Sequence, residues 1–589
     1  MMNDMMLDDL LTQWKAERTP DPGSFASLEY FENSFFAKVR SEKAKHIRKK
    51  TAEKPADQPL KVFMHDLGEL SLRSMIPSLA IGKFAELRPK FCISGELSAS
   101  IPSCNCDYAM AGPPDRSAPP AFNTEEYKTV GERPFVAAAT DPLSTFGADV
   151  DTAMYAETRR MILEEHRLPP QEAVRIEELV NYFDYDYPKP QGDDVLSPHF
   201  ELGPAPWDPE RKLLLIGVQA KTPVKEQLPA SHYVFLIDNS GSMECVFPMV
   251  KEAMTTLAEQ LRPGDKISLV TYGGSVKVLL EGCSDIRKVC RIIRKLEADG
   301  FTPGGEGIQT AYRIAGKHFI PDGNNRIVLI SDGDFNVGAS SEAELVRMVK
   351  EKRESGIYLS IAGCGMGNFK DNKLKMLANK GNGNVFYLDN LREAKRVFVH
   401  GMTGNMYALA RDVKFQIEFN PARVFAYRLL GYELRDMADR DFRDDRKESG
   451  TVGLGQQVTA LYEIIPADAS NKVKNAAVLD MPPLKYTVPT TNDSDDLLTF
   501  RIRYRKPLGK SASQERSMAV KPPLPATANW GWAAAVAEFA LALRESEAAP
   551  DASFDHAAGE AQKYLGEDPG GERAEFLLML RRAAELRRK

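Results

Sequence analysis

The chain has 589 residues, 43% of them hydrophobic and 27% charged, which is typical of a folded protein of about three or four domains. Its 77 basic and 83 acidic residues leave a net charge of −6, so its overall charge does not favour binding to nucleic acid or to an anionic membrane. The seven cysteines contain no CxxC pair and do not indicate a zinc ribbon.

The first 134 residues show no motif with a recognisable chemistry. Residues 1–50 are predicted to be helical, with Leu7, Leu10, Leu11 and Trp14 on one face. The basic stretch 38–50 is expected to be a solvated helix end, and contact with anionic lipid or a partner is the less favoured alternative. Residues 51–134 are rich in Pro, Ser, Ala and Gly and are predicted to form a linker of low order.

The N-terminus lacks the basic segment followed by an apolar core that marks a signal peptide. No apolar run reaches the roughly 18 residues of a membrane span. These two features lead us to expect a cytoplasmic protein without a transmembrane segment.

Residues 135–197 are predicted to be a helical lead-in module. Two helices, near 151–166 and 170–183, are separated by Pro169 and Pro170. Val174, Ile176 and Leu179 begin an apolar stripe with helical spacing, so this module is expected to be scaffold that packs on the next domain. Residues 198–228 follow with two predicted strands, at 199–202 and 213–218.

Strands and helices alternate between residues 229 and 402. Strands are predicted at 231–237, 266–272, 276–280, 326–331, 357–363 and 384–388, and helices near 247–262, 285–298, 306–319, 342–354, 371–380 and 391–400. Gly273 and Gly274 separate the second and third strands, as in a hairpin. The pattern predicts an α/β fold, a doubly wound and mostly parallel sheet with one antiparallel edge strand.

Residues 403–510 change to a period of two, which predicts a β-sandwich. Val413, Phe415 and Ile417 alternate with polar residues, and further strands are predicted at 424–431, 457–465, 484–488 and 497–505. A two-stranded piece is unstable alone, so 198–228 is expected to join this sandwich, with the α/β domain inserted between its parts. Residues 525–589 are predicted to be helical, near 530–545, 553–565 and 571–588.

The candidate chemistry follows the buried strand Tyr233–Ile237. This uncharged strand leads directly into Asp238, Ser240 and Ser242, which present one carboxylate and two hydroxyls in a loop. In an open α/β sheet this carboxyl end of a strand is where ligands bind. Oxygen donors without His or Cys suit a hard cation such as Mg²⁺ or Mn²⁺. A polar turn without metal is the alternative.

The Asp-x-Ser-x-Ser stretch resembles the motif that opens the metal-ion-dependent adhesion site of von Willebrand factor A domains, whose fold is Rossmann-like. Residues 140–589, with segments such as NNRIVLISDGDFNVG and FNPARVFAYRLLGYE, resemble the bacterial YfbK-type members of that family. The resemblance implies that Thr302 and Asp332 complete the metal site. Asp334 and Glu306 are expected to lie near it, Asp334 as an orienter of coordinated water or a solvated turn residue, and Glu306 as an added ligand or an obstruction.

The resemblance implies a metal-dependent protein-binding module of the adhesion type. A carboxylate from an Asp or Glu of an unidentified partner would replace a water on the cation. The alternative is a structural or adaptor subunit with a vestigial metal site, working with an AAA-type ATPase. Many relatives carry a membrane-anchoring start, so the family suggests the cell envelope, against the cytoplasmic expectation above.

Enzymatic readings fit the sequence poorly, so we expect that the chain is not an enzyme. Ser240 lacks the glycine two residues before it that a serine-hydrolase elbow requires. Gly316 and Lys317 are followed by His318, where a phosphate-binding loop needs Ser or Thr. The eight histidines form no HExxH motif.

Overall fold

The computed structural model describes residues 127, 129, 131–222, 228–298, 304–332, 342–365, 371–477, 494–507 and 511–588. All of them belong to one unit, Ile81–Lys589. The segment predicted as helical at 1–50, and the predicted linker 51–134 except its last few residues, lie outside the described residues. None of the helices in the described part of the chain has the length and apolar character that a membrane crossing needs.

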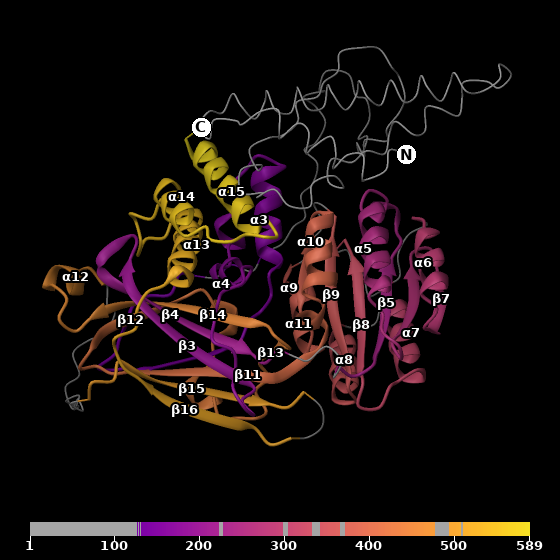
Figure 1. Cartoon of the computed structure of the whole chain (residues 1–589), viewed down its shortest axis with the longest axis horizontal. Coiled ribbons are helices and arrows are strands. Elements are labelled where there is room, and N and C mark those ends of the chain that lie inside the picture. Colours follow the sequence, from indigo (N-terminus) through magenta and orange to yellow (C-terminus); the bar gives the residue numbers. More distant parts are fainter. Residues whose placement is uncertain are drawn as a thin grey trace, which may run out of the picture. The chain divides into compact units, whose positions relative to one another are not determined.

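The α/β domain is built on a six-stranded sheet with the order β10-β9-β8-β5-β6-β7 (Figure 1). All neighbouring pairs are parallel except β6 and β7, which form the predicted antiparallel hairpin. β5, β8, β9 and β10 are buried along their whole length, as their apolar sequences require. The strands are β5 (Ser231–Asp238), β6 (Lys266–Tyr272), β7 (Val276–Cys283), β8 (Asn324–Ser331), β9 (Ile357–Cys364) and β10 (Val385–Leu388).

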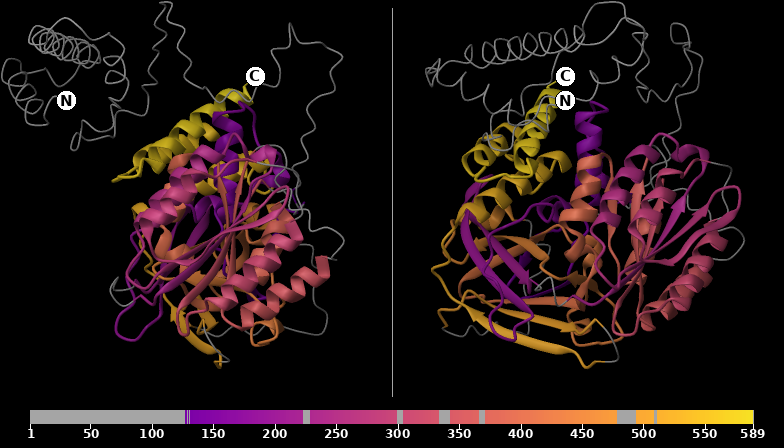
Figure 2. Two further views of the ribbon diagram at one scale, coloured as in Figure 1. Left: turned by 90° about the vertical axis from the view of Figure 1, so that its right-hand side faces the viewer. Right: turned by 45° about the vertical axis from the view of Figure 1, so that its right-hand side comes forward.

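Helices cover both faces of this sheet, so the doubly wound prediction is confirmed (Figures 1 and 2). Tyr233, Phe235 and Ile237 of β5 pack on the side of α5 (Phe247–Glu259), α6 (Ile286–Arg294) and α10 (Leu391–Lys395). Val234 and Leu236 point to the other face, against α7 (Gly304–Lys317), α8 (Glu342–Glu354) and α9 (Asp371–Lys380). A π-helical turn (Arg396–His400) and α11 (Met402–Met406) then lead out of the domain.

A β-sandwich surrounds the insertion point, as expected. Its first sheet has the order β1-β12-β14-β4-β3, and its second the order β13-β11-β15-β16, with β2 also paired to β11. β4 pairs with β14, for example Leu215 with Leu461, so the strands before and after the α/β domain share one sheet. The strands are β1 (Val136–Ala137), β2 (Leu143–Gly147), β3 (Leu196–Ala205), β4 (Asp208–Ala220), β11 (Ala408–Phe419), β12 (Val424–Leu430), β13 (Gly450–Gly453), β14 (Gln457–Pro466), β15 (Leu498–Arg505) and β16 (Gln514–Val520).

The structure differs from the sequence prediction in the lead-in module. Residues 135–197 supply the strands β1 and β2 to the sandwich in addition to helix α3 (Ala153–Leu163). The helix expected near 170–183 is reduced to a 3₁₀ turn (Gln171–Ala173) and the five-residue α4 (Ile176–Val180). The strand expected at 484–488 lies outside the described residues. Short elements elsewhere are α12 (Asn471–Ala476) and 3₁₀ turns at Gly241–Met243, Glu433–Arg435 and Asp439–Asp441.

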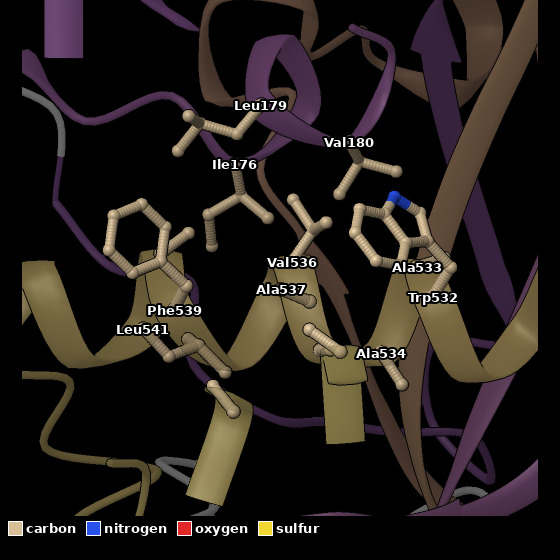
Figure 3. Packing of buried hydrophobic residues seen from close by; sticks show 14 of the residues in the cluster. Ile176, Leu179, Val180, Trp532, Ala533, Ala534, Val536, Ala537, Phe539 and Leu541 are labelled. Carbon is tan, nitrogen blue, oxygen red and sulfur yellow. The ribbon is translucent and has the colours of Figure 1, made fainter. Parts of the chain in front are cut away.

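The C-terminal helices pack on the lead-in helices. They are α13 (Ala528–Arg544), α14 (Phe554–Lys563) and α15 (Glu572–Arg587). Ile176 and Val180 of α4 face Trp532 and Val536 of α13 in one apolar core (Figure 3). Because Trp532 has no exposed area, the C-terminal helices are an integral part of the folded body.

A buried ion-pair cluster joins the lead-in helix α3 to two other parts of the chain. Its members are Arg159, Asp389, Glu393 and Glu575, and we call it the Arg159 cluster. The Arg159 guanidinium donates to Asp389 at the end of β10 (2.7 Å), to Glu393 of α10 (2.9 Å) and to Glu575 of α15 (2.9 Å). The side chains of Arg159 and Asp389 are 3% and 0% exposed. The cluster therefore ties the α/β domain to the C-terminal helices.

Arg159→Ala is expected to lower the free energy of unfolding by about 3–5 kcal/mol, since it leaves the fully buried Asp389 as a charge without its partner. Arg167→Ala is the matched control, because Arg167 forms a half-exposed pair with Glu165 that contributes about 1 kcal/mol or less. Urea unfolding followed by tryptophan fluorescence measures both losses. Equal midpoints for the two variants would contradict this role of the cluster.

Glu448 links the sandwich to the α/β domain. It accepts hydrogen bonds from Arg353 of α8 and Lys380 of α9, both at 2.7 Å. Burial alone would raise the pKa of Glu448, but these hydrogen bonds and charges outweigh it and lower the pKa to about 2. Because the pKa is lower in the folded state, the stabilisation is present above the unfolded value of 4.5 and is lost as the pH falls through about 2.

Glu448→Gln is therefore expected to lower Tm by roughly 2–4 °C at pH 7. The difference from the unmodified protein should shrink as the pH falls from about 4.5 toward 2. Calorimetric scans of both proteins at pH 7, 4 and 2.5 make the comparison. A difference in Tm that does not change with pH would argue against ionised Glu448 as the source of the stabilisation.

Candidate metal site

The candidate site lies at the carboxyl ends of β5 and β8, the neighbouring strands at the centre of the sheet. Their parallel register pairs Ile237 with Ile330, so Asp238 and Ser331 are next in line at the same edge. From β5 the chain continues to β6 on one side, whereas β8 lies on the other side. This reversal of strand order is the point in a doubly wound sheet where a crevice opens for a ligand.

Asp238 is held in place by the residues beside it. Its Oδ1 accepts the backbone N–H of Ser240 at 2.9 Å, and its Oδ2 accepts the Ser331 hydroxyl at 3.3 Å. Burial raises the pKa of Asp238, and the negative charge of Asp332 raises it further. The two carboxylates are therefore close enough to repel each other, which a bound cation would offset.

The two serines of the motif lie together. The Oγ atoms of Ser240 and Ser242 are 3.0 Å apart, and Ser240 precedes the 3₁₀ turn that contains Ser242. Ser240 is buried and Ser242 is exposed. The pair therefore extends from the buried Asp238 toward solvent, as a site open to a partner requires.

Asp332 directly follows β8 and is 5% exposed. Gly365, at the end of β9, packs against it: a Cβ at Gly365 would lie 3.1 Å from the Asp332 Cβ, and its φ of +94° favours glycine. Burial raises the pKa of the nearby Cys364 thiol, and the charges of Asp332 and Asp238 raise it further. The ends of three neighbouring strands thus converge around the two carboxylates.

The remaining predicted site residues are placed only in part. Thr302 and Asp334 lie outside the described residues. Glu306 is in the first turn of α7, where its side chain is exposed. One residue later, Gly307 lies so close to Tyr272 that an added Cβ would be 3.0 Å from the Tyr272 Cβ. α7 therefore begins close to the carboxyl end of β6, the neighbour of β5.

Sequence reasoning missed two residues beside the site, Tyr272 and Asn239. Tyr272 ends β6 and is fully buried; burial raises the pKa of its hydroxyl well above the usual value, and the charge of Asp238 adds to this. Asn239 donates to the Glu297 carbonyl at 3.5 Å, and its buried Oδ1 has no hydrogen-bond partner among the described residues. Asn239 could have been found from its place next to Asp238 in the sequence, whereas Tyr272 is brought beside Asp238 only by the pairing of β5 with β6.

The donors that the structure brings together suit a hard divalent cation. Asp238 and Asp332 supply two carboxylates, and Ser240 and Ser242 supply two hydroxyls. Mg²⁺ and Mn²⁺ prefer oxygen ligands of these kinds and keep bound water where the protein supplies fewer than six. Within the described ranges no group of three or more His, Cys, Asp and Glu side chains could hold a metal ion. Metal binding at this edge would therefore depend on the hydroxyls as well as the carboxylates.

Comparison with known families divides the chain in a way that agrees with this architecture. The model described as von Willebrand factor type A domain matches residues 233–334, and a von Willebrand factor model matches 121–215. The model described as "Uncharacterized protein YfbK, C-terminal" matches residues 404–586, which include most of the second half of the sandwich and the C-terminal helices.

Individual relatives differ in how much of the chain they cover. Inter-alpha-trypsin inhibitor heavy chain H2 of Homo sapiens is 29% identical over 161 residues, 26% of this chain and 17% of that protein. A solved structure, von Willebrand factor type A from Catenulispora acidiphila, is 14% identical with a TM-score of 0.38, over 68% of this chain and 91% of that one.

A more extensive similarity is to the "Uncharacterized protein YfbK" of Escherichia coli (strain K12). The two are 38% identical over 477 residues, which cover 78% of this chain and 80% of that protein. The aligned length far exceeds the matched von Willebrand factor A segment, so the similarity includes the sandwich or the helices as well. The chain therefore belongs to the YfbK family of bacterial von Willebrand factor A domain proteins.

Proposed function

We propose that the protein is a metal-dependent interaction module that binds an acidic side chain of a protein partner through a divalent cation, Mg²⁺ or Mn²⁺. Von Willebrand factor A domains suggest a protein-interaction or adhesion role. Asp238, Ser240, Ser242 and Asp332 would hold the cation, with Thr302 as a fifth ligand. When bound, the cation supplies an electrophilic position that a partner carboxylate can occupy in place of water.

The observation that carries the proposal is the pair of buried carboxylates at the switch point of the sheet. Asp238 and Asp332 are 1% and 5% exposed, and the charge of Asp332 raises the pKa of Asp238. Two buried carboxylates held close together repel each other, and a cation from solution would relieve that repulsion.

Each ligand has a separate role in the proposed site. Ser331 and the backbone N–H of Ser240 orient the Asp238 carboxylate through the two hydrogen bonds described above. Ser242, the exposed member of the motif, lies where a partner can approach. Neutral hydroxyls in place of further carboxylates leave the cation with net positive charge, which favours an anionic partner group. The proposal assigns no catalytic step to these residues.

Mg²⁺ or Mn²⁺ at about 100 times its dissociation constant is expected to stabilise the folded protein by about 2.7 kcal/mol, relative to the protein in EDTA. Asp238→Ala should abolish this rise, measured as the shift in Tm. The matched control is Asp265→Asn, which removes a buried carboxylate that accepts the Ser231 N–H at the opposite edge of the sheet. That control should lower Tm but keep the metal-dependent shift.

An unmodified protein whose Tm is the same in EDTA and in millimolar metal would count against the proposal. It would favour the structural or adaptor reading, in which the site is vestigial. A shift retained by Asp238→Ala but lost by Asp265→Asn would place metal binding elsewhere.

Asp332→Asn separates the charge of the site from its shape. In EDTA this variant should be more stable than the unmodified protein, by on the order of 1 kcal/mol, because the like-charge repulsion with Asp238 is removed. With metal present the order should reverse, because the amide is a poorer ligand. Asp322→Asn, on an exposed turn, is the control and should change neither value. An Asp332→Asn protein that is less stable in EDTA and keeps the metal shift would refute the role of Asp332.

A further inference from the structure

Helix α6 presents an exposed face made of basic side chains. The opposite face, with Val289, Cys290 and Ile293, is buried in the core that also contains α5. Figure 1 shows α6 beside α5 and the edge strand β7. The exposed side chains are spaced three and four residues apart and so form one stripe, which we call the basic face: Arg287, Lys288, Arg291, Arg294 and Lys295.

The basic face has no counter-ions of its own in the described part of the chain. None of its five side chains forms an ion pair with a described carboxylate, whereas other surface cations are paired, such as Lys317 with Glu281 and Lys395 with Glu252. Asp285 caps the start of α6 by accepting the backbone N–H of Lys288, and it does not neutralise the stripe. A concentration of unpaired cations is unusual in a chain with a net charge of −6.

Nearby acidic residues reduce this charge only in part. Glu297 follows the helix and is exposed, and Glu259 of α5 lies near Cys290, because the charges of Glu259 and Arg294 shift the pKa of that thiol in opposite directions. Together with Asp285, three carboxylates stand against five cations. The basic face therefore keeps an excess of positive charge.

One end of the basic face lies at the candidate metal site. The backbone carbonyl of Glu297, two residues after Lys295, accepts a hydrogen bond from Asn239 at 3.5 Å. Asn239 stands between Asp238 and Ser240. α6 rises about 1.5 Å per residue, so its nine residues carry the stripe roughly 13 Å away from the site. A partner bound at the metal would therefore lie close to one end of the basic face.

We propose that the basic face of α6 binds an acidic segment of the same protein partner whose carboxylate is bound at the metal site. This inference rests on the proposed function and extends it to the charge of the partner. A stripe of roughly 13 Å matches about four residues of extended chain at 3.3 Å each. Opposite charges on the two surfaces would also speed their association, more strongly at low ionic strength.

A narrow acidic polypeptide fits this surface better than a membrane or a nucleic acid. The cations occupy one helix face, and the exposed carboxylates Asp285 and Glu297 lie at its two ends. A broad anionic surface would meet those carboxylates together with the positive stripe, whereas a short segment can follow the stripe alone. Charge complementarity over about four residues therefore favours an acidic peptide.

The test uses a fluorescein-labelled peptide of eight glutamates and the full-length protein, with binding followed by fluorescence anisotropy at about 50 mM salt. Arg291→Gln with Arg294→Gln removes two charges from the basic face. The matched control, Arg313→Gln with Arg347→Gln, makes the same change at exposed helix positions on the other side of the sheet. The basic-face variant should bind roughly three- to tenfold more weakly, and the control should bind as the unmodified protein does.

Each outcome has a distinct meaning. Equal weakening in both double variants, or no binding of the peptide to the unmodified protein, would overturn the inference. So would tighter binding to vesicles of anionic phospholipid or to a short DNA duplex than to the peptide. Selective weakening that persists unchanged in EDTA and in Asp238→Ala would support the basic face but refute the proposed metal-dependent function. Selective weakening together with a loss of affinity in EDTA would support both.

Discussion

The buried charges around Arg159 hold the lead-in helix, the α/β domain and the C-terminal helices together. One guanidinium on α3 donates to the end of β10, to α10 and to α15. The two most distant members, Arg159 and Glu575, are 416 residues apart in the sequence. The cluster depends on Arg159, because without it Asp389 would be a fully buried charge that has lost its partner. The lead-in helix, the α/β domain and the C-terminal helices are therefore expected to fold and to move as one body, rather than as independent domains.

This constraint bears on the proposed interaction site because both lie at the same edge of the sheet. Asp389 follows β10 at its carboxyl end, and Asp238 and Asp332 follow β5 and β8 at theirs. β9 lies between β8 and β10, and Gly365 at its end packs on Asp332. A change in the position of Asp332 would therefore be resisted by packing that is itself anchored by Arg159. In the proposed site this packing would hold Asp238 and Asp332 in place, so that binding energy is not spent on ordering these two ligands.

The sequence predicted the parts of the fold that have strong periodicity. The uncharged run Tyr233–Ile237 identified the central strand, and alternation around Phe415 identified the sandwich. β1 and β2 were missed because strands of two and five residues show little period, and their partners lie almost 300 residues away. At the site, Asp238 and the two serines could be found from spacing alone. Tyr272 could not be found in this way. An aromatic residue at a strand end is expected to belong to the hydrophobic core, and its place beside Asp238 is known only from the pairing of β5 with β6.

The charge distribution around the site gives the last reason to expect an anionic partner bound through metal. The basic residues of α6 point to solvent from the outer face of the helix, whereas Asp238 and Asp332 are buried at the edge of the sheet. The nearby positive charge is therefore available to a partner rather than used to neutralise the carboxylates. A cation from solution could bind the carboxylates while an acidic chain from outside pairs with the basic face.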